Sequence, residues 1–249
     1  MSANSVTCSI NSIEYYNQDT RRILLDVPPE NSISFHAGQY LQMVLPHKKC
    51  PFSIANSPHL KNQIELHIRP TPDSEDSTAI EELLDNAKEI EIEAPLGDCF
   101  MTSPPDNILI LVAASTGITQ MKSIIEYLEP DGFKHPVHLY WGVVCDRDLY
   151  LASLCESWES KHSNFHFVPV VSEPDTSPNW AGRTGLVGVE ALNDFEDVSD
   201  VTVYVSGGPG MVYATLDAFV ERGMPQAGMH SDIFSFAPRP TTSPGTARA

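Results

Sequence analysis

The chain has 249 residues, of which 41% are hydrophobic, and its formal net charge at pH 7 is -18. So strong a negative charge excludes broad binding to nucleic acid or to an anionic membrane surface, because both need a cationic protein face. The longest apolar run, Ile108–Ala114, is much shorter than the roughly 20 residues of a membrane-spanning helix, so we expect no membrane span. The segment Met1–Asn4 has neither a basic region nor an apolar core, so we expect no secretory signal and a cytoplasmic protein.

The first hundred residues are typical of short strands separated by Gly- and Pro-containing turns. Six segments alternate apolar and polar residues or are rich in β-forming residues: Thr7–Ile13, Thr20–Asp26, Gln39–Leu45, Ser53–Ala55, Ile64–Arg69 and Glu89–Glu93. This pattern predicts a six-stranded antiparallel barrel. One helix interrupts it at about Ser77–Asn86, with Ser77 as the expected N-cap.

From residue 104 onward, apolar strands alternate with amphipathic helices. We expect strands at Ile108–Ala113, Val137–Trp141, Phe165–Val171, Val201–Val205 and Asp232–Phe236. We expect helices at Gln120–Leu128, Leu149–Lys161, Gly188–Asp194 and Val212–Arg222. The alternation predicts a doubly wound, mainly parallel α/β sheet. The expected units are a barrel domain over residues 1–103, an α/β domain over 104–238 and a disordered tail over 239–249, where the residues are small and polar.

The cysteines give no sign of a metal site. The five cysteines stand at wide spacings without a Cys-x-x-Cys pair, which predicts neither a disulfide framework nor a zinc or iron–sulfur centre. The sequence also has no Gly-x-Ser-x-Gly elbow and no Walker loop. Their absence removes the commonest hydrolase and NTPase hypotheses.

Four short motifs stand at expected strand ends. They are Cys50-Pro51-Phe52-Ser53, Ala113-Ala114-Ser115-Thr116-Gly117, Tyr140-Trp141-Gly142 and Ser206-Gly207-Gly208-Pro209-Gly210-Met211. In this order the chain resembles the ferredoxin-NADP reductase superfamily, most closely its NAD(P)H:flavin oxidoreductase branch. The resemblance spans about Thr7 to Phe236. It implies a flavin-binding barrel that binds FAD or FMN, as cofactor or substrate, followed by a domain that binds NADH or NADPH.

The first motif carries the resemblance on the flavin side. In the family an Arg binds flavin phosphate, an aromatic residue follows, and a Ser hydroxyl approaches flavin N5. Cys50, Phe52 and Ser53 occupy these positions, so the resemblance implies a catalytic role for Ser53. It also implies weakened phosphate binding, because a thiol carries no positive charge. Lys48 and Lys49 are the neighbouring cations that could replace the guanidinium.

Two further segments resemble flavin-contacting parts of the family. His67, Ile68 and Arg69 end an expected barrel strand, and strand alternation puts His67 and Arg69 on one face. They are interpreted either as contacts to the flavin or as a solvent-facing pair. Phe236, in the expected last strand, is either a shield over the flavin ring or a core aromatic residue.

The other motifs carry the nicotinamide side. Thr116 and Gly117 open an expected helix, whose N-terminus bears partial positive charge, and the resemblance implies a catalytic, nicotinamide-placing role for Thr116. Gly207 would admit the ring against the backbone. Arg183 is either a phosphate or ribose contact or a structural salt bridge. The residues implied in cofactor binding are Cys50, Pro51, Phe52, Ser53, His67, Ile68, Arg69, Ala114, Ser115, Thr116, Gly117, Trp141, Gly142, Arg183, Gly207, Gly208, Pro209 and Phe236.

The function implied is an NAD(P)H-dependent flavin reductase that moves hydride from nicotinamide C4 to flavin N5. Two alternatives stay open. One is an electron-transfer component that keeps its flavin and serves an oxygenase-type partner or another electron acceptor. The other is a non-catalytic flavin or dinucleotide sensor, suggested by five departures from the family pattern: Cys50, Ala114, Ser115, Val144 and Ser206.

Overall fold

Apolar residues alternate along the N-terminal strands, and in the computed structural model, which describes residues 3–239, these strands form one curled antiparallel sheet. The strands are β1 (Asn4–Tyr15), β2 (Arg21–Asp26), β3 (Tyr40–Leu45), β4 (Lys48–Ser53), β5 (Gln63–Ile68) and β6 (Glu89–Leu96). Their order is β4-β3-β6-β1-β2-β5, and the edge strands β4 and β5 come into contact as the sheet curls into a barrel. Ile23, Leu41 and Ile92 are among the fully buried residues inside it. The predicted six-stranded antiparallel architecture is confirmed.

Helix α1 (Glu75–Asn86) packs Ile80 and Leu84 against the barrel core. The helix begins earlier than expected, and the prediction of Ser77 as its N-cap is wrong. Ser74 is the cap, because its hydroxyl oxygen accepts the backbone N–H of Ser77 at 3.3 Å. Two acidic residues follow Ser74 in the first turn, where negative charge favours the helix dipole.

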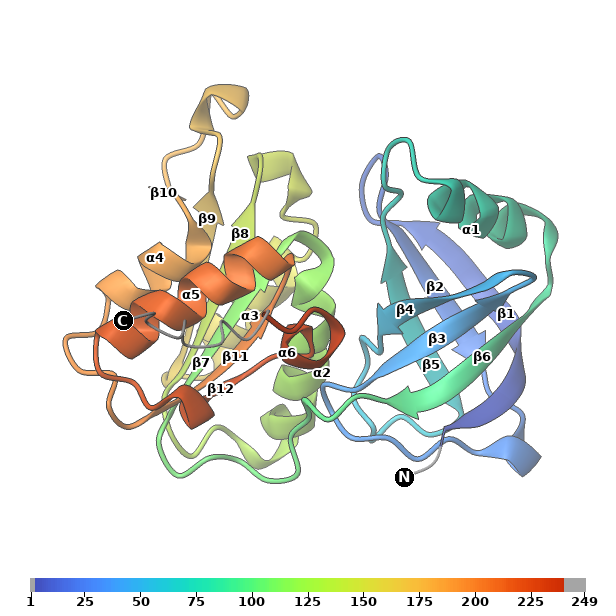
Figure 1. Cartoon of the computed structure of the whole chain (residues 1–249), viewed down its shortest axis with the longest axis horizontal. Coiled ribbons are helices and arrows are strands. Elements are labelled where there is room, and N and C mark those ends of the chain that lie inside the picture. Colours follow the sequence, from blue (N-terminus) through green and yellow to red (C-terminus); the bar gives the residue numbers. More distant parts are fainter. Residues whose placement is uncertain (1–2, 240–249) are drawn as a thin grey trace, which may run out of the picture.

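The C-terminal half forms a parallel sheet with helices on both faces (Figure 1). Its strands are β7 (Ile108–Ala114), β8 (Val137–Val143), β9 (Phe165–Val171), β10 (Arg183–Thr184), β11 (Val201–Ser206) and β12 (Met229–His230). Its helices are α2 (Ile118–Leu128), α3 (Ala152–Lys161), α4 (Val187–Asn193), α5 (Pro209–Glu221) and α6 (Ile233–Phe236). The strand order is β10-β9-β8-β7-β11-β12, with every neighbouring pair parallel. The predicted doubly wound sheet is confirmed.

Strand β7 shows why a continuous apolar run suits the centre of this sheet. Leu109 and Leu111 belong to the core shared with α2 and α3, whereas Ile110 and Val112 belong to the core shared with α4 and α5. Both faces of the strand are therefore buried, as parallel sheets require. Helix α2 lies at the border between the two sheets (Figure 1).

Two strand predictions are wrong in their placement. The segment Asp232–Phe236 is not a strand but a turn leading into α6, because the carbonyl of Asp232 accepts the N–H groups of Ser235 and Phe236. Strand β4 ends at Ser53 instead of beginning there. Because Pro51 argues against a strand, the sequence placed the start of this strand too late. An edge strand nevertheless tolerates a residue without an N–H group.

The described residues bear on two further expectations. Within residues 3–239, no helix is long and apolar enough to cross a membrane. The expected disordered tail lies outside the described residues except for Arg239, whose guanidinium group pairs with the carboxylate of Asp217.

Candidate active site at the domain interface

Three of the four motifs lie side by side because β7 stands between β8 and β11. Ala114 at the end of β7 is paired with Gly142 on β8, and Ala113 is paired with Ser206 on β11. The carboxyl ends of parallel strands are where open α/β sheets bind ligands. The parallel register thus places the nicotinamide-side motifs along one edge.

Glycines let two of these motifs approach each other closely. A Cβ atom on Gly117 would lie 2.4 Å from the carbonyl oxygen of Ser206, a contact that no side chain can make. A Cβ atom on Gly207 would lie 2.4 Å from Cε of Met211 and 3.0 Å from Cβ of Ala114. Gly117 therefore holds the start of α2 against the end of β11.

A cavity of about 330 Å³ lies between the two domains. The barrel lines it with Tyr40, Pro51, Phe52 and Ser53, and the α/β domain lines it with Gln120, Ser206, Gly207, Ser231, Asp232, Ile233 and Phe236. We call it the interdomain cavity. The first and fourth motifs, about 150 residues apart in the sequence, meet across it.

Aromatic rings form part of the wall of the interdomain cavity. The rings of Tyr40 and Phe236 have centroids 5.0 Å apart and are tilted by 50°. Phe236 is 48% exposed, so it is not a core residue. Burial, with help from the nearby carboxylate of Asp232, raises the pKa of Tyr40, which keeps its hydroxyl protonated.

Asp232 and Gln120 are site residues that the sequence reasoning missed. The amide Nε2 of Gln120 donates to Oδ2 of Asp232 at 3.0 Å and to the carbonyl oxygen of Gly38 in the barrel at 2.9 Å. Burial of the carboxyl group raises the pKa of Asp232 to about 6, although the hydrogen bond from Gln120 acts in the opposite direction. Their positions, just after the last strand and in the first turn of α2, were the signal available.

A second cavity, of about 390 Å³, lies within the α/β domain, and we call it the uncharged cavity. It is lined by Ala114, Ser115, Gly142, Val143, Val144, Ser172, Gly185, Leu186, Val187, Gly188, Val189, Gly210, Met211, Ala214 and Thr215. None of these side chains is ionisable. Among the predicted site residues, Ala114, Ser115 and Gly142 belong to this wall.

Ser115 adopts the backbone conformation that favours glycine. Its φ angle is 51°, whereas that of Ala114 is −118°. Of the two replaced glycine positions, the one at 115 therefore needs left-handed backbone, which costs a side-chain-bearing residue roughly 1–2 kcal/mol. The buried indole of Trp141 donates from Nε1 to the carbonyl oxygen of Ser115 at 2.9 Å and holds this conformation in place.

Several predicted site residues line neither cavity. The thiol-bearing Cys50 is buried in the barrel core, and that burial raises its pKa. Lys48 forms an ion pair with Asp76, and Lys49 forms one with Glu93. Both cations next to Cys50 are thus engaged with surface carboxylates.

The His67–Arg69 segment and Arg183 also lie away from both cavities. The His67 side chain is fully buried, so the solvent-facing alternative is wrong for this residue. Arg69 pairs with Asp19 at 3.0 Å and with Asp148 at 3.2 Å. Arg183 forms the salt-bridge alternative, since its Nη1 lies 2.8 Å from Oδ1 of Asp194.

The remaining predicted residues also line neither cavity. Ile68 and Trp141 are buried, Thr116, Gly208 and Pro209 directly adjoin lining residues in the chain, and Gly117 lies two residues after Ser115. Among residues 3–239, no group of three or more His, Cys, Asp or Glu side chains could hold a metal ion.

Comparisons with known proteins show the family of the chain. Residues 7–101 match the oxidoreductase FAD-binding domain, and residues 111–217 match the oxidoreductase NAD-binding domain. An NAD(P)H-flavin reductase from Aliivibrio fischeri is 34% identical over 238 residues, which are 93% of this chain and 99% of that protein. The chain belongs to the ferredoxin reductase-like FAD- and NAD-binding oxidoreductases. The family expected from the four motifs is confirmed.

Other members of this family carry different names. The CDP-6-deoxy-L-threo-D-glycero-4-hexulose-3-dehydrase reductase of Yersinia pestis is 33% identical over 228 residues, or 91% of this chain and 68% of that protein. A crystal structure of an Amycolatopsis cytochrome P450 reductase superposes with a TM-score of 0.81 at 27% identity, covering 92% of this chain and 69% of that one. The ferredoxin reductase in carbazole 1,9a-dioxygenase, at 19% identity and a TM-score of 0.78 over 92% of this chain and 69% of that one, shares the fold.

Proposed function

We propose that the protein is an NAD(P)H:flavin oxidoreductase whose reaction takes place in the interdomain cavity. The observation that carries the proposal is that Ser53 of the barrel and Gly207 of the α/β domain line the same cavity. When both ring systems are bound, the nicotinamide supplies a hydride at C4 and the flavin accepts it at N5. The protein's own contribution is to orient the rings and to exclude water.

The residues of the interdomain cavity fit flat, partly polar ring systems. Tyr40, Phe52 and Phe236 offer aromatic surface, and Gly207 leaves backbone open to close approach. In this proposal the Ser53 hydroxyl hydrogen-bonds the ring edge near N5, while Thr116 helps to position the nicotinamide from the start of α2. Phe236 shields the bound ring from solvent.

The flavin-phosphate side of the barrel fits less well. A buried Cys50 replaces the family's Arg, and Lys48 and Lys49 are each paired with a carboxylate. A phosphate needs a directed cation or several N–H donors to be held tightly. We therefore propose that flavin binds through its ring and exchanges as a substrate.

The uncharged cavity is proposed to take the nucleotide end of the dinucleotide. It adjoins the carboxyl ends of β7 and β8, and its wall includes Ala114, Ser115 and Gly142. The start of α2, at Thr116 and Gly117, offers backbone N–H groups next to it. Gly208 and Pro209 at the start of α5 directly precede the lining residue Gly210.

A second candidate function is an electron-transfer component that keeps its flavin and serves an oxygenase-type partner. The specific observation in its favour is the TM-score of 0.81 with a cytochrome P450 reductase. The two candidates differ in what the purified protein contains. A retained flavin gives a yellow protein that turns over without added flavin.

The deciding experiment measures oxidation of NADH and of NADPH by the purified protein, with riboflavin, FMN and FAD added separately. Turnover that depends on added flavin, from a colourless protein, is the expected result. Flavin or dinucleotide binding without turnover for any pair would overturn the proposal and favour the sensor. A yellow protein active without added flavin would favour the electron-transfer component.

A further inference from the structure

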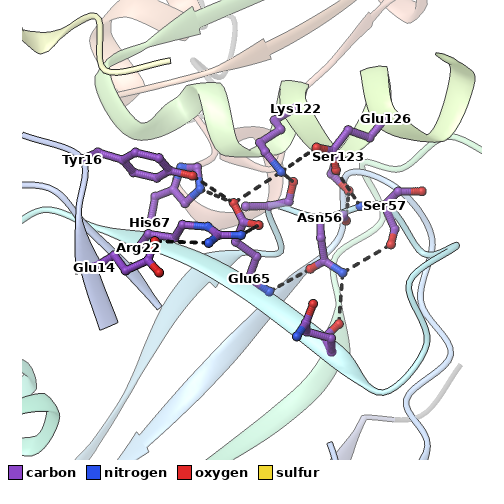
Figure 2. Close-up of polar contacts among 12 residues, drawn as sticks. Glu14, Tyr16, Arg22, Asn56, Ser57, Glu65, His67, Lys122, Ser123 and Glu126 are labelled. Atoms are coloured by element: carbon purple, nitrogen blue, oxygen red, sulfur yellow. Dashed lines mark hydrogen bonds and ion pairs between the residues drawn. The ribbon is translucent and has the colours of Figure 1, made fainter. Parts of the chain in front are cut away.

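Helix α2 carries a buried cation at the domain border. The side chain of Lys122 is 5% exposed, and a charged group so far from solvent is costly unless it is paired. Its Nζ lies 2.7 Å from Oε1 of Glu126, 3.3 Å from Oε1 of Glu65 and 3.3 Å from the carbonyl oxygen of Ala55. Figure 2 shows Lys122 pointing from α2 toward Glu65. Two of these three partners belong to the barrel, so the ammonium group joins the domains.

Glu65 on β5 is the barrel's anchor for this cation. Its carboxylate lies 2.7 Å from Nε2 of His67 and 3.1 Å from Nη2 of Arg22, and the Tyr16 hydroxyl donates to it at 3.4 Å (Figure 2). Against the effect of burial, hydrogen bonds to His67 and Arg22 and the charge of Lys122 hold the pKa of Glu65 far below its ordinary range. The carboxylate therefore stays charged, and its position is fixed from several sides.

Helix α2 is hydrogen-bonded to residues 55–57 of the barrel, which follow closely after Ser53. The hydroxyl of Ser123 donates to the carbonyl oxygen of Asn56 at 2.8 Å, and Oε2 of Glu126 accepts the N–H of Ser57 at 3.1 Å (Figure 2). Together with Lys122 and Ala55, these contacts fix every residue from 55 to 57 to one face of α2. Ser53 ends β4 only two residues before this segment.

The other end of α2 touches the opposite wall of the interdomain cavity. Gly117, just before the helix, lies against the Ser206 carbonyl, and Gln120 in its first turn donates to Asp232. A regular helix of this kind is a stiff element that rises about 1.5 Å per residue. Helix α2 is thus a rigid link between the Ser53 wall and the Ser206–Gly207 wall.

We propose that Lys122 is a positioning residue that sets the distance between the two walls of the interdomain cavity. Its ammonium group, held between Glu65 and Glu126, fixes the register of α2 on residues 55–57. This proposal rests on the proposed function, in which the two walls hold the two reacting rings. Because hydride transfer needs the rings at near-contact distance, a small displacement of α2 lowers the rate without abolishing binding.

The test compares Lys122→Met with the surface control Lys161→Met, which removes an exposed cation near Glu129. We expect Lys122→Met to lower kcat by on the order of 10-fold to 10²-fold, with KM values changed far less. The kinetic isotope effect with C4-deuterated NADH should rise, because the hydride step becomes more rate-limiting.

A readout without cofactor or turnover separates this proposal from the proposed function. Hydrogen exchange of the Ser57 amide, which is bonded to Glu126, should speed up in Lys122→Met and stay unchanged in Lys161→Met. If Lys122→Met does not fold, Ser123→Ala, which removes only the bond to Asn56, should show the same changes at smaller size. Unchanged kcat, isotope effect and exchange in the folded variant would overturn the positioning role. A wild-type protein with no turnover would overturn the proposed function. Hydrogen exchange of the Ser57 amide would then decide whether Lys122 fixes α2 on residues 55–57.

Discussion

The interdomain cavity and the uncharged cavity share one edge of the α/β sheet but differ in chemistry. The first contains an Asp, a Gln and three Ser residues, whereas the second contains no ionisable side chain. The first also draws residues from both domains, and the second from one. The difference separates two tasks: directed polar groups orient reacting rings, and small uncharged residues admit the rest of a ligand. Substitutions in the interdomain cavity should therefore have larger effects on turnover and stability than substitutions in the uncharged cavity.

The largest expected effect is that of Ser53→Ala. Loss of a preorganised hydroxyl beside the reacting atoms should lower kcat by on the order of 10²-fold, as removal of one such donor does in other enzymes. Steady-state kinetics at saturating flavin and NADH measure it. The matched control is Ser160→Ala, an exposed hydroxyl on α3. A kcat equal to that of the control would remove Ser53 from the proposed mechanism.

Asp232→Asn should alter the pH dependence of stability. Because burial raises the pKa of Asp232 to about 6, ionisation is unfavourable in the folded state. The native protein therefore loses stability as pH rises from about 4 to above 6, by about 3 kcal/mol for a rise of this size. The variant lacks this loss.

Chemical denaturation of both proteins at several pH values checks the linkage. Asp232→Asn should be the more stable protein at pH 7, and its advantage should shrink toward zero near pH 4. A stability difference that stays constant across this pH range would contradict the raised pKa. This pH dependence arises in the interdomain cavity and has no counterpart in the uncharged cavity, whose wall has no ionisable side chain.

The uncharged cavity should favour NADH over NADPH. No cation on its wall could offset the additional 2′-phosphate, and charged hydrogen bonds of that kind are worth about 1.5–3 kcal/mol each. We expect kcat/KM for NADH to exceed that for NADPH by about tenfold or more. Val144→Arg, at a half-exposed position on the wall, should reduce the ratio. Equal kcat/KM values for NADH and NADPH in the native protein would contradict the role proposed for the uncharged cavity.

The smallest expected effects concern the turn at the end of β7. Ser115→Gly should raise the free energy of unfolding by up to about 1 kcal/mol, because Ser115 has a left-handed φ of 51°. Ala114→Gly, at φ −118°, should instead lower it by about 0.5–1 kcal/mol, since glycine gains freedom in the unfolded chain. Urea denaturation of the two variants measures both. The same sign for both would contradict the assigned conformations.

The sequence predicted those features that depend on local pattern. The apolar run Ile108–Ala114 has one explanation, a buried parallel strand, and the motifs at strand ends follow from the order of strands. Asp232 was harder to place, because the aromatic residues at 234 and 236 alternate as in a strand although both lie in the short helix α6. The strand prediction failed because the N–H groups of Ser235 and Phe236 bond locally to the Asp232 carbonyl, which makes a helical turn of this segment.

The buried charges could not be predicted from sequence alone. Lys122 looks like part of the polar face of an amphipathic helix, and Glu65 looks like the polar side of an alternating strand. Only the packing of one domain against the other buries both. These buried charges arise from contacts between segments far apart in the chain. The burial of Cys50 depends instead on the register between the neighbouring strands β3 and β4.

Pro51 bears on whether copies of this protein aggregate through strand pairing. Strand β4 ends the strand order of its sheet and contacts β5 without a ladder between them, and an unpaired strand edge is a template on which another chain can add a strand and begin to aggregate. Pro51 offers no N–H group to an added strand of another chain, and Lys48 and Lys49 place charges at the start of β4. The edge strand that forms one wall of the interdomain cavity is thereby protected against cross-chain β-pairing while the cavity stays accessible to small molecules.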